Sequence, residues 1–104
     1  MAYRIEITPS ALGALEGIKD RRTRAAIMRR IDGLTEDPDK QGKALRAELT
    51  GYFSVRAAGQ RYRVVYQVGA LEGRVVVVLV GIRKEGGRED VYALAQRLLR
   101  RGLL

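Results

Sequence analysis

The sequence predicts an α+β fold, a compact β-α-α-β-β-β-α domain in which helices pack on one face of an antiparallel sheet. Short stretches of alternating apolar and polar residues predict strands at the N-terminus and in the second half of the chain. Between them, apolar residues recur at helical spacing. The 104 residues, 46% of them hydrophobic, suffice for one core, so we expect a single domain over residues 1–104.

The first half contains one predicted strand and two predicted helices. Apolar side chains alternate with Arg4 and Glu6 in the first strand. Thr8-Pro9 then has the form of an N-cap and a first helical residue, which predicts a helix over residues 9–19. A turn near Asp20 leads to a second helix. Its buried stripe has the spacing i, i+4, i+7: Ile27, Ile31 and Leu34.

The second half predicts three strands, over residues 52–57, 61–68 and 75–82. Short glycine-containing turns separate them, which makes them an antiparallel meander. The last of the three is apolar on both faces and is therefore predicted to be central. A final helix is predicted over residues 89–101, and the stripes of the two N-terminal helices must cover one face of the sheet.

The composition favours a polyanionic partner and excludes several kinds of site. Lys and Arg number 20 against 12 Asp and Glu, a net charge of +8 that attracts nucleic acid or an acidic protein, although a merely basic surface is the alternative. The chain lacks Cys and His, so we expect no disulfide, no metal and no cofactor. The N-terminus has no apolar signal region and residues 75–80 are too few to span a bilayer, so we expect a soluble cytoplasmic protein without membrane contact.

Arginines gather in the predicted meander. Alternation places Arg56 and Arg63 on one polar face of adjacent strands, Arg83 ends the third strand, and Tyr92 follows the Gly86-Gly87 hinge in the first turns of the last helix. Guanidinium groups suit phosphate because their planar fork donates two hydrogen bonds and stays charged. Taken singly, each arginine is more simply a solvated strand residue and the tyrosine a packing residue. Together they indicate a phosphate site that could cleave RNA without a metal.

Five segments, in this order, resemble the RelE/ParE superfamily of bacterial toxins, specifically its RelE-like branch: YRIEITPSALGAL, KALRAELTGY, RYRVVYQV, VVVVLVGIRKE and DVYALAQRLL. The resemblance implies helices packed on an antiparallel sheet. It also implies the toxin of a type II toxin–antitoxin system, a ribosome-dependent endoribonuclease that cuts the mRNA codon in the A site by attack of the 2′-hydroxyl. The implied partners are the ribosome, mRNA and a RelB-like antitoxin.

The resemblance also assigns roles to residues. It implies that Arg83 stabilises the phosphorane, that Tyr92 stacks on a base and assists proton transfer, and that Arg63 binds phosphate. Arg56 falls near a family lysine that acts as base or acid. Further basic residues are expected to contact RNA: Lys43, Arg46, Arg61 and Lys84.

One strand departs from the family pattern. The best-studied active members have two lysines on it, where this chain has Ser54 and Arg56. Because arginine stays protonated, it is a poor general base. Two alternatives therefore stay open: a ParE-like toxin that inhibits DNA gyrase without catalysis, and an inactive member that only binds its antitoxin.

Overall fold

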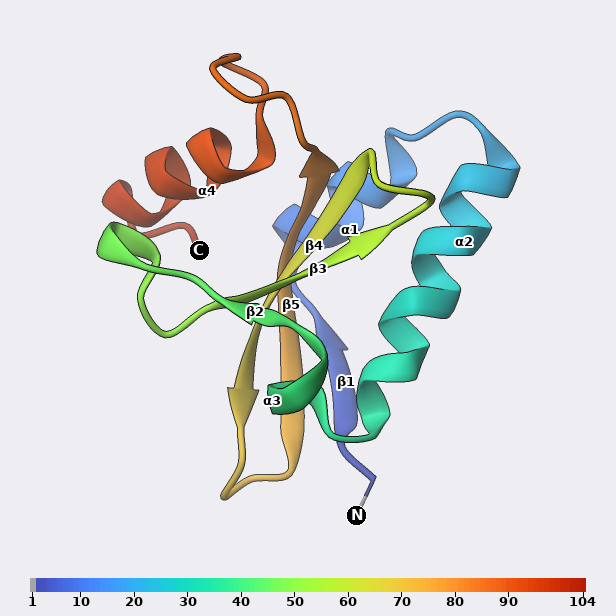
Figure 1. Cartoon of the computed structure of the whole chain (residues 1–104), viewed down its shortest axis with the longest axis vertical. Helices are drawn as coiled ribbons and strands as arrows, with labels where there is room; N and C mark the ends of the chain where they lie inside the picture. Colours follow the sequence, from blue (N-terminus) through green and yellow to red (C-terminus); the bar gives the residue numbers. More distant parts are fainter. Residues whose placement is uncertain (1) are drawn as a thin grey trace.

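The computed structural model describes residues 2–104 and confirms the α+β fold class, with helices packed around a five-stranded sheet (Figure 1). None of the helices within these residues is long and apolar enough to cross a membrane. Two 3₁₀ turns, η1 (Gly33–Thr35) and η2 (Ala47–Leu49), supplement the main elements. The main elements in chain order are β1 (Arg4–Ile7), α1 (Pro9–Glu16), α2 (Arg21–Asp32), α3 (Pro38–Gln41), β2 (Lys43–Ala44), β3 (Phe53–Ala57), β4 (Tyr62–Gly69), β5 (Arg74–Ile82) and α4 (Val91–Arg100).

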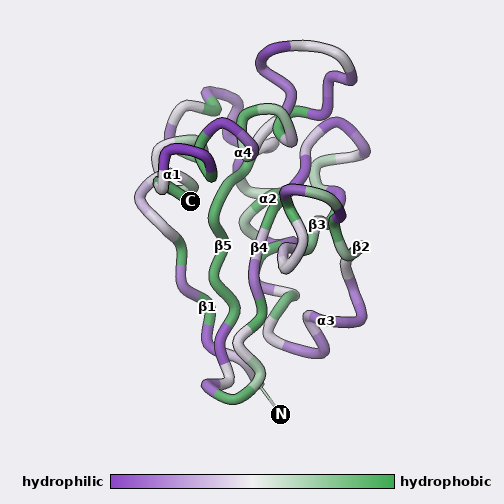
Figure 2. Tube along the Cα trace, turned by 90° about the vertical axis from the view of Figure 1, so that its left-hand side faces the viewer, coloured by the Kyte–Doolittle hydropathy of each residue, from purple (hydrophilic) through white to green (hydrophobic). Residues whose placement is uncertain are grey.

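The sheet is mixed and not wholly antiparallel. Its order is β1-β5-β4-β3-β2, and the predicted antiparallel meander of β3, β4 and β5 is confirmed. β1, however, pairs parallel with β5, Arg4 opposite Arg74. Short turns force consecutive strands to run antiparallel. The helices α1 and α2 separate β1 from the other strands in the chain, so β1 can pair in either direction. As predicted, β5 lies between two strands, and Figure 2 shows that it is hydrophobic along most of its length.

α1 and α2 cover one face of the sheet, as expected. The side chain of Thr8 caps α1 by accepting a hydrogen bond from the Ala11 N–H at 3.3 Å. α1 ends at Glu16, earlier than the predicted residue 19, because Gly17 forms its C-cap. The predicted stripe of the second helix is fully buried in the core between these helices and the sheet, which we call the first core: Ile27 and Ile31 lie in α2, and Leu34 lies in η1 directly after it.

α4 packs on the opposite face, so the expectation that the helices share one face is wrong in this detail (Figure 1). There Val91 and Ala95 are buried against Val65 and Leu79 in a second core. The physical reason is that β5 is apolar on both faces. α1 and α2 already cover one of them, so the apolar stripe of α4 is buried on the other.

A β-bulge in β5 decides which side chains reach the α4 face. Val65 is paired with Leu79 and Tyr66 with Val77, which leaves Val78 as an extra residue. Val78 and Leu79 both belong to the core under α4. The alternation of β5 therefore shifts by one residue, and Gly81 comes to face α4.

Gly81 allows α4 to begin close to the sheet. A Cβ atom at this position would lie 3.1 Å from Cγ2 and 3.2 Å from Cβ of Val91. Both distances are shorter than ordinary carbon–carbon contacts, and Val91 is fully buried, so its side chain would have to shift by a few tenths of an ångström within a packed core.

We therefore expect Gly81→Ala to lower the free energy of unfolding by about 1–2 kcal/mol because the added methyl group overpacks the second core. The control is Gly13→Ala in α1, where an added Cβ would meet no atom within 4 Å. That change should stabilise the protein by about 0.5–1 kcal/mol. Urea unfolding measures both, and an unchanged or higher stability of Gly81→Ala would contradict the packing argument.

Candidate active site

A cleft of about 270 Å³ opens where β3, β4 and the end of β5 meet the start of α4. We call it the arginine cleft. Its lining residues come from β2, β3, β4, the loop after β5, and α4: Lys43, Ser54, Arg56, Arg63, Arg83 and Tyr92. Segments far apart in the sequence therefore supply a phenol, a hydroxyl and several cations to one small space.

The strand register brings the arginines together. Arg56 lies directly opposite Arg63, and Arg63 lies opposite Gly81. Like charges opposite one another on adjacent strands repel, so this pair favours a bound anion. Gly81 itself has no side chain, and Val91 of α4 packs against it.

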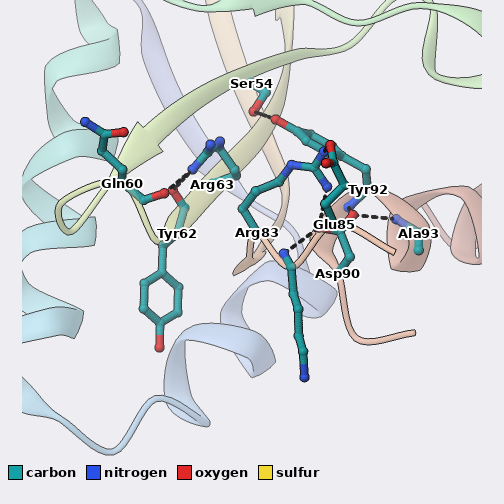
Figure 3. Close-up of polar contacts among 10 residues, drawn as sticks. Ser54, Gln60, Tyr62, Arg63, Arg83, Glu85, Asp90, Tyr92 and Ala93 are labelled. Carbon is teal, nitrogen blue, oxygen red and sulfur yellow. Dashed lines mark hydrogen bonds and ion pairs between the residues drawn. The ribbon is translucent and has the colours of Figure 1, made fainter. Parts of the chain in front are cut away.

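Arg63 is oriented by backbone carbonyl groups. Its Nη1 donates to the carbonyl oxygens of Gln60 at 2.5 Å and Tyr62 at 3.2 Å (Figure 3). Arg56 makes a longer contact of 3.5 Å to the side-chain oxygen of Gln60. Among residues 2–104 neither guanidinium has a carboxylate partner. Their positive charge therefore remains available to a ligand.

Asp90 is the buried carboxylate that holds Arg83 in place. Its Oδ1 accepts from Nη1 of Arg83 at 2.6 Å and from the Lys84 N–H at 2.7 Å. Its Oδ2 caps α4 by accepting from the N–H groups of Tyr92 at 3.1 Å and Ala93 at 3.4 Å. Asp90 is only 4% exposed, so one carboxylate ties the end of β5 to the first turn of α4 (Figure 3).

The electrostatics of this pair favour the charged forms. Burial alone would raise the pKa of Asp90, but hydrogen bonds from Arg83 and from the Lys84 and Ala93 N–H groups outweigh it and hold that pKa below its ordinary value. The hydrogen bond to Asp90 in turn raises the pKa of Arg83. Nη2 of Arg83 meets Glu85 at 3.1 Å, a carboxylate exposed enough for an incoming anion to replace it.

Tyr92 faces the cleft with both its ring and its hydroxyl. The guanidinium carbon of Arg83 lies 4.9 Å from the centre of the Tyr92 ring, in a cation–π contact. The Tyr92 hydroxyl is 2.7 Å from Oγ of Ser54, which is buried in β3 (Figure 3). The phenol is thus fixed at both ends. It can stack on a flat group through its ring and exchange a proton through its hydroxyl.

The structure brings together five of the eight predicted site residues and leaves three outside the cleft. The five that line it are Lys43, Arg56, Arg63, Arg83 and Tyr92. Arg46 lines a neighbouring hollow, and Lys84 is paired with Glu89 at 2.7 Å. Arg61 is exposed in the turn before β4. The roles assigned to all eight remain predictions.

Sequence reasoning missed Asp90. An Asp directly before an apolar helical stripe is an N-cap signal, and it would have moved the predicted helix start from Glu89 to the observed Val91. The sequence also gave no reason to pair Ser54 with Tyr92, which lies 38 residues away. Among residues 2–104 no three acidic side chains come close enough to hold a metal ion. What the cleft offers is anion binding, stacking and proton exchange.

We expect Asp90→Asn to lower the free energy of unfolding by about 2 kcal/mol at pH 7, because it leaves the half-buried Arg83 with only the exposed carboxylate of Glu85 as a counter-charge. A depressed carboxyl pKa stabilises the fold above the unfolded value of about 4, and this stabilisation is lost as the pH falls through the folded-state pKa. The difference in the free energy of unfolding between variant and wild type, measured by urea unfolding, should therefore become smaller towards pH 3. Glu16→Gln, at the exposed end of α1, is the control; a difference that does not change with pH would contradict the assignment.

Comparison with known proteins identifies the family. Residues 5–86 match the model of the ParE toxin of type II toxin–antitoxin systems. Toxin RelG of Mycobacterium tuberculosis is 31% identical over 92 residues, which cover 88% of this chain and 98% of RelG.

Solved structures agree with the sequence matches. The RelBE2 toxin–antitoxin complex of M. tuberculosis has a chain that is 32% identical, with a TM-score of 0.71 over 80% of this chain and 93% of that one. A free form of the Escherichia coli toxin RelE shares the fold, with a TM-score of 0.73 at 21% identity over 96% of this chain and 98% of that one. A phosphate-suited cleft on this fold and these relatives lead to one conclusion: the chain belongs to the RelE/ParE family and is a toxin of the type II toxin–antitoxin class.

Proposed function

We propose that this toxin is a metal-independent endoribonuclease that cuts mRNA in the ribosomal A site. The observation that carries the proposal is the stack of Arg83 on Tyr92 inside a cleft that Arg63 also lines. Such a cleft suits a substrate with a phosphate next to a flat base. mRNA has both.

The reaction we propose is a transesterification. The 2′-oxygen attacks the neighbouring phosphorus, the bond from phosphorus to the 5′-oxygen breaks, and the products carry a 2′,3′-cyclic phosphate and a 5′-hydroxyl. Negative charge grows on the non-bridging oxygens in the transition state. Arg83, already oriented by Asp90, and Arg63, oriented by backbone carbonyls, donate hydrogen bonds to these oxygens.

Tyr92 positions the substrate in this proposal. Its ring stacks on a base, and its hydroxyl, held by Ser54, takes part in moving the 2′-hydroxyl proton towards solvent. Preorganisation supports this role, because the ring is fixed on one side by Arg83 and at its hydroxyl by Ser54.

Lys43 can replace the lysines that active members of the family have on the strand where this chain has Ser54 and Arg56. It lies opposite Ser54 on the neighbouring strand β2 and lines the same cleft. Arg56 cannot fill this role, because its guanidinium does not give up a proton at working pH. We propose that the Lys43 ammonium gives its proton to the leaving 5′-oxygen and regains one from water.

An antitoxin partner follows from the relatives, whose solved structures include toxin–antitoxin complexes. We propose that a RelB-like antitoxin forms a hetero-oligomer with this chain and neutralises its basic cleft with acidic side chains. Action on ribosomes would place the protein in the cytoplasm.

The match of residues 5–86 to the ParE toxin favours a second candidate, inhibition of DNA gyrase without catalysis. The arginine cleft is not needed for that activity, so its presence favours cleavage. A third candidate is an inactive member that only binds its antitoxin. If the protein inhibits DNA supercoiling by gyrase, and substitutions in the arginine cleft leave that inhibition unchanged, the protein is a gyrase inhibitor. If it neither cuts mRNA nor inhibits gyrase but still binds its antitoxin, it is an inactive member.

In an assay with purified protein, programmed ribosomes and mRNA with an empty A site, we expect a cut in the A-site codon. Arg83→Ala should slow it about 100- to 1,000-fold because it removes a donor to the developing charge. Tyr92→Phe should slow it about 100-fold, because the ring remains but the hydroxyl is lost. Arg21→Ala, an exposed arginine at the start of α2, is the control. Mapping of the mRNA ends measures all three, and the absence of any wild-type cut with protein in excess over ribosomes would reject the nuclease.

Substitutions of Lys43 separate charge from proton donation. Lys43→Arg keeps the cation but cannot give up a proton, so we expect kcat to fall about 100-fold with KM nearly unchanged. Lys43→Gln should raise KM as well. Lys40→Arg, exposed in α3, is the matched control. Wild-type cleavage by Lys43→Arg would mean that Lys43 contributes charge alone.

A further inference from the structure

A second hollow, of about 480 Å³, adjoins the arginine cleft. We call it the Arg30 hollow. It shares Lys43, Ser54 and Arg56 with the arginine cleft and extends from them to Arg30 and Gln41. Its lining residues come from α2, α3, β2 and β3, whose arrangement can be followed in Figure 1. The two spaces therefore share a wall.

Gln41 holds Arg30 in position. Nη1 of Arg30 donates to the side-chain oxygen of Gln41 at 2.6 Å. The amide nitrogen of Gln41 donates to the carbonyl oxygens of Gly33 at 2.7 Å and Glu36 at 2.6 Å. The amide of Gln41 is thus engaged at both of its polar atoms, and the guanidinium of Arg30 keeps its other donors for a ligand.

A buried tyrosine fixes the corner that carries Gln41. The hydroxyl of Tyr66 donates to the carbonyl oxygen of Pro38 at 2.7 Å. Burial raises the pKa of Tyr66 to about 12, so this hydroxyl keeps its proton at any working pH. A Cβ atom on Gly42 would overlap the same hydroxyl, so only glycine allows the chain to pass this closely. The corner between α3 and β2 is therefore tied to the core.

The cations of the hollow are not neutralised by the protein. In the part of the chain from residue 2 to residue 104, Arg30, Lys43 and Arg56 form no ion pair with a carboxylate. The neutral side chains that complete the lining are Gln41, Ser54 and Val55. An anion that enters would thus meet three positive groups and no negative one.

We propose that the Arg30 hollow binds a second phosphate of the same RNA strand, next to the one that is cut. The inference rests on the proposed function only in taking RNA as the ligand. From Arg83, the strand would pass Arg56 and Lys43 at the shared wall and reach Arg30. Such a path fits a flexible single strand, whose phosphates follow one another at short intervals, and the guanidinium of Arg30 would contact the second phosphate.

The test compares binding of two RNAs that cannot be cut, because the attacking 2′-hydroxyl is replaced by hydrogen. One is a dinucleotide with a single phosphate, and the other is a tetranucleotide with three. We expect Arg30→Ala to weaken binding of the tetranucleotide about tenfold and to leave the dinucleotide unchanged. The slope of log affinity against log salt concentration should fall by about 0.7, the value for one lost contact to a single strand. Fluorescence anisotropy measures both.

Two further variants sharpen the comparison. Arg29→Ala removes an exposed arginine that neighbours Arg30 in α2 but does not line the hollow, and it should bind both RNAs like the wild type. Gln41→Ala keeps the charge of Arg30 but removes the hydrogen bond that orients it. Its affinity for the tetranucleotide should therefore fall by less than about tenfold, and its affinity for the dinucleotide should not change. Thermal unfolding checks that each variant is folded.

Several outcomes would overturn the proposal. They are equal binding of the two RNAs by the wild type, no binding of either, or an equal effect of Arg30→Ala on both lengths. A loss of binding to an acidic antitoxin peptide, with RNA binding unchanged, would assign the hollow to the antitoxin instead. Because these RNAs cannot be cut, the result is independent of the cleavage assay, and either idea can fail while the other stands.

Discussion

The carboxylate of Asp90 connects the parts of the molecule on which the site depends. It accepts hydrogen bonds from the Arg83 guanidinium and the Lys84 N–H at the end of β5, and from two N–H groups in the first turn of α4. Arg83 and Tyr92 are therefore oriented by the same buried charge. Such a network is strong because the interior screens charge poorly, and for the same reason the loss of one partner is costly.

Two backbone features of β5 bring these groups to the correct face. The bulge at Val78 shifts the alternation of the strand, and Gly81 then lets the start of α4 approach the sheet. An unbroken strand would direct Gly81 towards α1 and α2 instead. The position of the site thus depends on packing in the second core, since Val78 and Leu79 both contribute to it.

The charges of the site are divided between structure and ligand. Arg83 is paired with Asp90, which orients its guanidinium. Arg56 and Arg63 lie opposite each other on neighbouring strands, and neither forms an ion pair with a carboxylate within residues 2–104. Repulsion between these two favours an anion, and the proposed reaction provides one that gains charge in the transition state. The proposed acidic antitoxin would neutralise the same excess of cations.

The sequence by itself determined the α+β class, the meander, the buried stripe of α2 and the residues with which phosphate could be bound, because these follow from periodicity and side-chain chemistry within short stretches. Only the tertiary structure decided the parallel pairing of β1, the face occupied by α4, and the contacts of Asp90 and of Ser54 with Tyr92. It also decided that Lys43 lines the cleft while Arg46, Arg61 and Lys84 do not. The physical reason is that these features depend on contacts between distant segments and on a one-residue bulge, which no local pattern encodes.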